Sequence, residues 1–455
     1  MAALERKYYP TRSGQLPGRH ASRILTEVTE TPIVGYLTAI GECLKSTSLQ
    51  VRTYGKRQAI SCSESFQPQP HPTSSVYPSI HILHLPLLGS GQDLDQRPAA
   101  MDLSKPVDSQ FTKSLPKIEL HAHLSGSISR QCLHEIWLQK KARDPAFDIE
   151  DPWAVMPPGK VDFSLNTFFG VFNQSIYHLV NDLESVAYAT TSVLQVFLDD
   201  GVRYLELRTI PRASPNAAFT RDQYLSTVLD TIARFKSQNP DKISVYLILG
   251  MDRGQLTNDS AHAHDIVDLA IANQERGVVG IDVCGNPTKG DISLCRDAFA
   301  KAKKHGLGLT IHFAEVPSMD LREELQIMLS FNPDRLGHVI HVPDDIKQEI
   351  ARRRLGLELC ISCNVHAKMF DGGFLDHHFG YWRHEECPVI LCTDDVGFFC
   401  SPVSNEYLLA AEHFQLRRRD LLSISRKAVK AIFGGQEEKQ RLWNVLDEFE
   451  LNYGQ

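Results

Sequence analysis

From Lys117 onward, short apolar runs alternate with longer stretches in which apolar residues recur at helical spacing. Near-continuous apolar runs are typical of parallel strands that are buried on both faces, whereas stretches such as LESVAYATTSVLQVFLDD predict helices. A regular alternation of the two predicts an α/β fold of the (β/α)8, or TIM-barrel, class. The predicted strands cover residues 117–124, 203–210, 244–252, 278–285, 307–315, 334–342, 355–364 and 388–395.

The segment between the first two predicted strands, residues 125–201, is much longer than one crossover requires. We therefore expect extra helices inserted after the first strand, where they would cap the mouth of the barrel. A doubly wound open sheet is the alternative architecture. It would usually bind phosphate through a glycine-rich first turn, and neither GxGxxG nor GxxxxGK[ST] occurs in the chain.

The first hundred residues have a different character from the rest of the chain. The stretch SESFQPQPHPTSS is rich in proline, serine and glutamine, a composition that predicts a disordered linker. We expect residues 1–107 to form a largely disordered N-terminal extension and residues 108–455 to form the barrel domain. A chain that begins at Met101 should then fold by itself.

The composition of the chain argues against several classes of protein. The chain has 455 residues and a net charge of -7, which argues against a partner such as DNA or RNA. We find neither an apolar stretch long enough to span a bilayer nor the apolar core of a secretory signal. The ten cysteines follow no disulfide-scaffold spacing. We expect a cytoplasmic monomer, with a transit peptide as an alternative because basic residues are frequent near the N-terminus.

The polar residues at the ends of the predicted strands are selective in type. His121 and His123 are two positions apart, so their side chains share one face of the first strand. The chemistry of a parallel barrel lies at the carboxyl ends of its strands. Taken singly, each histidine or aspartate is more often a core or capping residue, but together they predict a zinc site with four protein ligands. The predicted ligands are His121, His123, His312 and Asp394.

Three further polar residues lie in the predicted strands or at their ends. A zinc-bound water has a pKa of about 7 and can act as a nucleophile at neutral pH. Glu315 comes three residues after His312 and could donate or relay a proton. His338 could accept the proton of the water or hold the attacking group in line. Asp395 follows the predicted ligand Asp394 directly.

From about Lys117 to its C-terminus, the chain resembles the adenosine and AMP deaminase branch of the amidohydrolase superfamily. The similarity is carried by HAHLSGS, ELRTIPR, GIDVCGNP, TIHFAE, RLGHVIH and CTDD, and DHHFGYW resembles the subgroup that acts on N6-methyl-AMP. The resemblance implies hydrolytic deamination at purine C6. It implies that Glu315 protonates N1, that His338 orients the attacking water and takes its proton, that Asp395 helps bind the purine and the attacking group, and that the Gly285 backbone meets the purine edge.

Two absences refine that expectation. Binuclear members of the superfamily often carry a modified lysine at the end of the fourth strand, and GIDVCG has none there, so we expect one zinc ion per chain. The other common deaminase site combines H-x-E with P-C-x-x-C, and this combination does not occur here.

The opening motif bears on the substrate. Free-nucleoside members of the family resemble H-x-H-L-D-G, where the aspartate meets the ribose 5'-hydroxyl, but this chain has Ser125 in that place. A carboxylate would repel a 5'-phosphate, a hydroxyl can donate to it, and an arginine fork suits its oxygens. Tyr177 stands where animal members tend to have histidine. The resemblance implies a nucleotide site lined by His123, Ser125, Tyr177, Thr209, Ile210, Pro211, Arg212, Asp252, Gly285 and Asp395.

We therefore expect the partner to be a small purine nucleotide, and the reaction to convert N6-methyl-AMP to IMP and methylamine in nucleotide salvage. Deamination of free adenosine and a non-catalytic, zinc-stabilised scaffold are the alternatives. Zinc binding alone requires neither Glu315 nor His338, so their presence argues against the scaffold. We interpret Cys360 and Cys363 as structural, with diverging sulfurs in an extended strand, and His366, His377 and His378 as surface residues.

Overall fold

The computed structural model describes residues 102–214, 218–317 and 321–453. The predicted N-terminal extension therefore lies outside the described residues, apart from its last few positions. Within them, parallel strands pair in chain order from β1 to β8, which confirms the (β/α)8 barrel. The strands are β1 Lys117–His123, β2 Val202–Thr209, β3 Ser244–Asp252, β4 Val278–Cys284, β5 Gly308–Phe313, β6 Arg335–His338, β7 Gly356–Leu359 and β8 Val389–Leu391.

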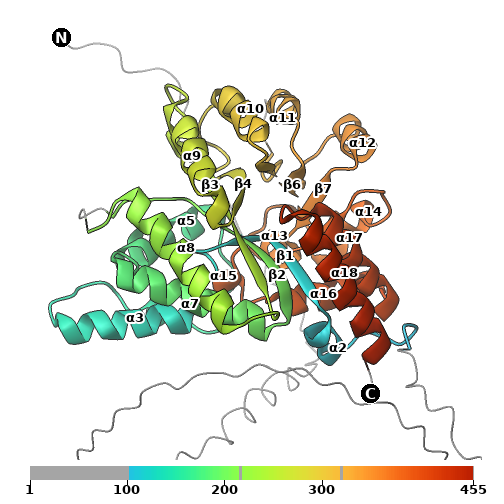
Figure 1. The fold of residues 1–455 in the computed structure, drawn as a ribbon, viewed down its shortest axis with the longest axis horizontal. Coiled ribbons are helices and arrows are strands. Elements are labelled where there is room, and N and C mark those ends of the chain that lie inside the picture. The colour runs from blue at the N-terminus through green and yellow to red at the C-terminus, as the bar shows by residue number, and fades with distance from the viewer. Residues whose placement is uncertain (1–101, 215–217, 318–320, 454–455) are drawn as a thin grey trace, which may run out of the picture. The chain divides into compact units, whose positions relative to one another are not determined.

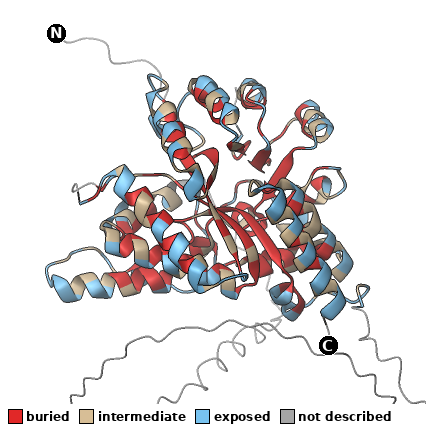
Figure 2. Ribbon diagram, in the orientation of Figure 1, coloured by how far each residue is buried: buried red, intermediate tan, exposed pale blue. Residues whose placement is uncertain are grey.

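Helices surround the strands, as Figure 1 shows. The strands are buried almost throughout, while the helices expose their outer faces (Figure 2). The main helices after the strands are α8 Arg221–Gln238, α9 Ala261–Ala272, α10 Arg296–Lys304, α11 Leu321–Ser330, α12 Asp344–Arg353, α13 Ile361–His366, α14 Phe379–Trp382, α15 Val396–Phe399, α16 Val403–Phe414, α17 Arg418–Ala431 and α18 Gly435–Asn452, and α2 Ser109–Ser114 precedes β1. Among the described residues, no helix combines the length and the apolar character that crossing a membrane requires.

The predicted insertion after the first strand is present. It consists of α3 Arg130–Arg143, α4 Pro152–Val155, α5 Leu165–Val171, a π-helical turn Phe172–Ile176, α6 Tyr177–Leu179 and α7 Leu183–Asp199. Helix α7 begins at a capping box, in which Asp182 accepts a hydrogen bond from Ser185 N and the Ser185 hydroxyl contacts the Asp182 backbone. One apolar face of α7 is buried on the barrel.

The last strands are shorter than the sequence predicts. The prediction of one strand over residues 355–364 is wrong beyond Leu359, because helix α13 begins at Ile361. Glu406 on α16 fixes this helix start by accepting hydrogen bonds from the backbone N–H of Ser362 at 3.0 Å and from its hydroxyl. Cys363 is consequently helical, and the expectation of an extended CISC segment fails.

The barrel closes between β1 and β8 over a very short contact. One bridge joins Ala122 to Asp394, where Asp394 N–H donates to His121 O at 2.8 Å and His123 N–H donates to Asp394 O at 3.0 Å. This closure places two histidines of the first strand beside the aspartate that follows the last strand.

Candidate metal centre and active site

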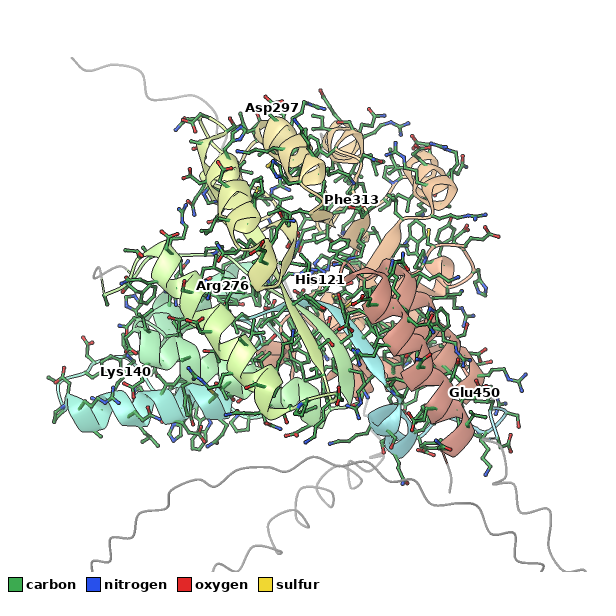
Figure 3. All side chains as sticks on the ribbon, viewed as in Figure 1. His121, Lys140, Arg276, Asp297, Phe313 and Glu450 are labelled. Atoms are coloured by element: carbon green, nitrogen blue, oxygen red, sulfur yellow. The ribbon has the colours of Figure 1, made fainter. Side chains whose placement is uncertain are left out.

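The side chains of His121, His123, His312 and Asp394 converge at the carboxyl end of the barrel, and Figure 3 labels His121 inside the ring of helices. The Nε2 atoms of His123 and His312 lie 3.0 Å apart. Asp394 Oδ1 lies 3.5 Å from His121 Nε2 and 3.4 Å from His123 Nε2. His338 belongs to the same cluster, since one ligand atom each from His121, His312, His338 and Asp394 lies within 4.8 Å of the others. A set of imidazoles and one carboxylate suits zinc.

Two buried carboxylates orient the central histidines. His121 Nδ1 lies 2.8 Å from Glu358 Oε2, and His312 Nδ1 lies 3.1 Å from Asp282 Oδ1. Each carboxylate can only accept, so each ring carries its hydrogen on Nδ1 and offers the Nε2 lone pair to a metal. The sequence analysis missed Glu358 and Asp282, although both interrupt apolar strands, in LGLELC and GIDVCG.

The backbone of the site is unusual. Ala314, His338 and Asp394 have φ angles of 56°, 65° and 60°, in the left-handed region that non-glycine residues seldom adopt. Two glycines permit close contacts. A Cβ atom on Gly126 would lie 1.4 Å from Asp395 Oδ1, and one on Gly337 would lie 2.7 Å from His121 Cε1. The chain is thus held in a strained conformation where the polar side chains meet.

Burial shapes the protonation of the acidic groups. Burial raises the pKa of Glu315, and Asp394 adds to the rise while His312 opposes it. Burial together with the adjacent Asp394 carboxylate also raises the pKa of Asp395 well above its usual range. A raised pKa favours the protonated form of Glu315, which is the form that a proton donor needs. His121 Nε2, His338 Nε2 and Asp395 Oδ1 are buried and have no hydrogen-bond partner in the structure.

A cavity of about 380 Å³ opens onto these groups. Pro211 and Arg212 are absent from its lining, and His121 and His338 lie deeper than its surface. The predicted residues that line the cavity are His123, Ser125, Tyr177, Thr209, Ile210, Asp252, Gly285, His312, Glu315, Asp394 and Asp395.

Arg212 lies behind Tyr177. Its guanidinium is 4.9 Å from the centre of the Tyr177 ring and also contacts the rings of Phe219 and Tyr224. One of its nitrogens donates to Val180 O at 2.5 Å. The structure therefore brings Tyr177 to the cavity wall and places Arg212 on the far side of that ring.

The sequence analysis did not identify several residues that line the cavity. The insertion and α15 supply an aromatic wall of Phe168, Phe169, Phe172 and Phe399, and Lys289 follows strand β4 at the rim. Cys363, interpreted as structural from the sequence, lines the cavity and lies 2.9 Å from Asp394 Oδ2. The aromatic spacing in LNTFFGVFNQ is equally typical of a core helix, so the sequence alone did not distinguish the two.

The interpretation of His377 and His378 as surface residues is wrong. His377 is buried and its Nε2 lies 3.1 Å from Asn364 Oδ1, while His378 Nε2 donates to His338 O at 2.6 Å. Their aromatic neighbours in FGYW pack into the core, since Phe379 and Trp382 are fully buried. This packing draws the preceding histidines inward, behind the candidate site.

The fold is a parallel barrel, and the histidines and the aspartate at its carboxyl end form a site that is compatible with metal binding, as in the barrel class of enzymes. The family model for adenosine deaminase matches residues 116–449. The human protein N6-Methyl-AMP deaminase is 35% identical over 356 residues, which cover 75% of this chain and 96% of the human one. The N6-mAMP deaminase of Arabidopsis thaliana is 33% identical over 360 residues, or 74% of this chain and 98% of its own.

Solved structures agree with the sequence matches. The crystal structure of the Arabidopsis N6-mAMP deaminase aligns with a TM-score of 0.68 and 34% identity, and covers 74% of this chain and 99% of its own. A solved ADAL–IMP complex aligns with a TM-score of 0.69 and 33% identity, over 75% of this chain and 99% of its own. The chain belongs to the adenosine deaminase family and is a hydrolytic deaminase.

Proposed function

We propose that the chain binds one zinc ion and converts N6-methyl-AMP to IMP and methylamine. The observation that carries the proposal is the convergence of His121, His123, His312 and Asp394 beside Glu315, at the base of a cavity large enough for a nucleotide. Relatives named N6-methyl-AMP deaminases match about three quarters of the chain, and one solved relative holds IMP, the expected product.

The reaction needs a nucleophile, a proton donor and a positioned purine. When bound to His121, His123, His312 and Asp394, zinc would acidify a water molecule so that it can attack C6. Burial raises the pKa of Glu315 and so favours its protonated form, which would pass a proton to N1 and make C6 electrophilic. Asp395 Oδ1 and His338 Nε2 make no hydrogen bond within the protein, so both could bind the attacking group or the purine. The proton that the attacking water releases would then be passed to N6, and methylamine leaves as the bond between C6 and N6 breaks.

The hydroxyl groups in the cavity wall favour a substrate that carries a phosphate. Ser125 and Thr209 line the cavity with hydroxyls, and neither presents a negative charge to a phosphate. The Thr209 hydroxyl is 2.7 Å from the Tyr224 hydroxyl, which holds it in place. Lys289 at the rim adds a cation. We propose that Ser125 and Thr209 bind the 5'-phosphate, and that Arg212 joins them when Tyr177 moves aside.

One observation favours free adenosine as a second candidate substrate. Arg212 is engaged by Val180 O and by the rings of Tyr177, Phe219 and Tyr224, and it does not line the cavity. Unless Tyr177 moves, its guanidinium does not reach a ligand in the cavity. In that case the phosphate contact would fall to Lys289, or the substrate would carry no phosphate.

A four-substrate assay tests the proposal. N6-methyl-AMP should be turned over much faster than AMP, N6-methyladenosine and adenosine, with release of methylamine. Arg212→Ala and Lys289→Ala should weaken turnover of the nucleotide far more than that of the nucleoside, and the larger loss identifies the phosphate ligand. Equal turnover of N6-methyl-AMP and N6-methyladenosine by the wild type would contradict the phosphate argument and favour the nucleoside.

Elemental analysis tests the metal. Protein purified without added metal should contain about one zinc ion per chain, and His312→Ala should lose both the zinc and the activity. His305→Ala is the matched control, because His305 is exposed at the end of α10. A metal-free protein with full activity would contradict the zinc site.

A further inference from the structure

We propose that His377 is a positioning residue: acting through Asn364, it fixes His338 in the tautomer whose hydrogen is on Nε2, so that His338 donates a hydrogen bond to the attacking group and does not take its proton. The proposal deepens the proposed function, since it rests on the role of His338 in that reaction. It also assigns a role to the histidine pair of DHHFGYW.

The hydrogen-bond chain starts at a backbone amide whose direction is fixed. Phe379 N lies 3.0 Å from His377 Nδ1, and a backbone N–H can only donate, so Nδ1 of His377 accepts. Neutral His377 then carries its hydrogen on Nε2. That atom lies 3.1 Å from Asn364 Oδ1 and donates to it.

The orientation of the Asn364 amide then determines which nitrogen of His338 accepts a hydrogen bond. With Oδ1 occupied, the Asn364 amide nitrogen faces His338 Nδ1 at 3.1 Å and donates to it. The same nitrogen lies 3.3 Å from the Met369 sulfur, an acceptor for its second hydrogen. Because Nδ1 of His338 accepts, the hydrogen of the neutral ring is on Nε2. Nε2 lies 3.4 Å from Glu315 Oε1 and 3.8 Å from Asp394 Oδ2.

The surroundings hold this arrangement in place. His338 and Asn364 are fully buried and His377 is 2% exposed, so water does not compete for these bonds. His378 stacks on His377, with ring centres 4.0 Å apart, and donates to the backbone carbonyl of His338 at 2.6 Å. The pair thus restrains both the ring of His338 and its left-handed backbone, where φ is 65°.

The tautomer has two chemical consequences. An Nε2 atom that carries hydrogen has no lone pair for a metal, so His338 is excluded as a ligand although it belongs to the cluster, and His121, His123, His312 and Asp394 remain. It also cannot accept the proton of the attacking water at that atom. Proton acceptance then falls to a neighbouring carboxylate, such as Glu315 after it has given its own proton to N1.

Two substitutions at His377 separate positioning from packing. His377→Phe keeps a ring but removes the Nε2–H donor, and we expect kcat for N6-methyl-AMP to fall about 10–100-fold with KM and zinc content unchanged. His377→Gln restores an amide donor toward Asn364 and should recover kcat to within about threefold of the wild type. His366→Phe is the control, because His366 is on the same helix as Asn364 and packs on Phe374.

Nitrogen-15 NMR of histidine-labelled, zinc-loaded wild type tests the tautomer directly, with His338→Gln used to identify the signals. A protonated Nε2 and an unprotonated Nδ1 support the proposal; the reverse overturns it, as does an unchanged kcat in a folded, zinc-loaded His377→Phe variant. If that variant does not fold, the NMR result decides. Absence of turnover of N6-methyl-AMP by the wild type would contradict the proposed function while the tautomer measurement still stands.

Discussion

Two levels of the barrel differ in how their buried polar groups are paired. In the interior, below the mouth, every charge of one network meets an opposite charge. Arg208 lies 3.0 Å from Asp282 and 2.8 Å from Glu358. Arg335 lies 2.6 Å from Glu358 and 2.6 Å from Glu206. Close ion pairs of this kind make buried charge tolerable at low dielectric.

At the mouth, the ion contacts between polar groups are longer. His121 Nε2 lies 3.5 Å from Asp394 and His338 Nε2 lies 3.4 Å from Glu315, which is longer than the ion pairs of the interior, and neither nitrogen makes a hydrogen bond. The Asp394 and Asp395 carboxylates also lie side by side. The backbone is strained at the same place. The comparison teaches that this chain pairs its buried charges closely where they only support the site, and pairs them loosely beside the cavity, where the proposed metal and substrate would bind.

The largest effect should come from the mouth. Glu315→Gln removes the carboxyl group that would donate a proton to N1, and turnover of N6-methyl-AMP should fall by about 10²–10⁴-fold. Thermal stability and zinc content should stay close to wild type, because Glu315 is not a proposed ligand. Loss of zinc from this variant would instead place Glu315 among the ligands, and unchanged turnover would remove its catalytic role.

Substitutions in the interior network should lower the stability of the fold. Arg335→Ala leaves the buried carboxylates of Glu206 and Glu358 without one of their partners, which should lower the free energy of unfolding by about 3–5 kcal/mol. Arg322→Ala breaks an exposed pair with Asp345 and should cost less than about 1 kcal/mol. Urea unfolding of both variants measures the difference. Equal losses would mean that the interior network contributes no more than a surface pair.

The part of this site that the sequence predicts is the part set by strand geometry. HAHL, TIHFAE and CTDD end their strands with polar residues, and parallel strands bring such ends together. The pairing behind the ligands depends instead on contacts between distant segments. Glu358 meets His121 across 237 positions, and His377 reaches Asn364 only because FGYW folds into the core. A single sequence does not contain those distances.

Arg212 and Cys363 are residues whose positions the sequence did not predict. Their residue types suggested a phosphate ligand and a structural thiol, yet the structure places the first behind Tyr177 and the second against Asp394. The extended conformation assumed for CISC was the specific error. It fails because Glu406, more than forty positions downstream, fixes a helix start at that point.

Glu406 is a buried carboxyl group that belongs neither to the interior network nor to the cavity. The effect of its titration on the stability of the fold should be the smallest of the effects predicted here. It is fully buried, and its partners are the neutral hydroxyls of Ser362 and Ser401 and one backbone N–H, so burial raises the pKa of Glu406 to about 7 despite those hydrogen bonds. The unfolded chain releases this proton near pH 4.5, the ordinary value for glutamate. Between these two values, the folded state binds more protons than the unfolded state does. Its contribution to stability is therefore complete below pH 4.5 and is lost as pH rises through about 7, by up to roughly 3 kcal/mol.

Glu406→Gln should remove this dependence of stability on pH, whereas Glu412→Gln, exposed on the same helix, should keep it. Urea unfolding at pH 5 and pH 7.5, at equal zinc loading, measures the slopes. If Glu406→Gln keeps the wild-type slope, the carboxylate is ionised at neutral pH, and the helix that carries Asn364 is held by a charge.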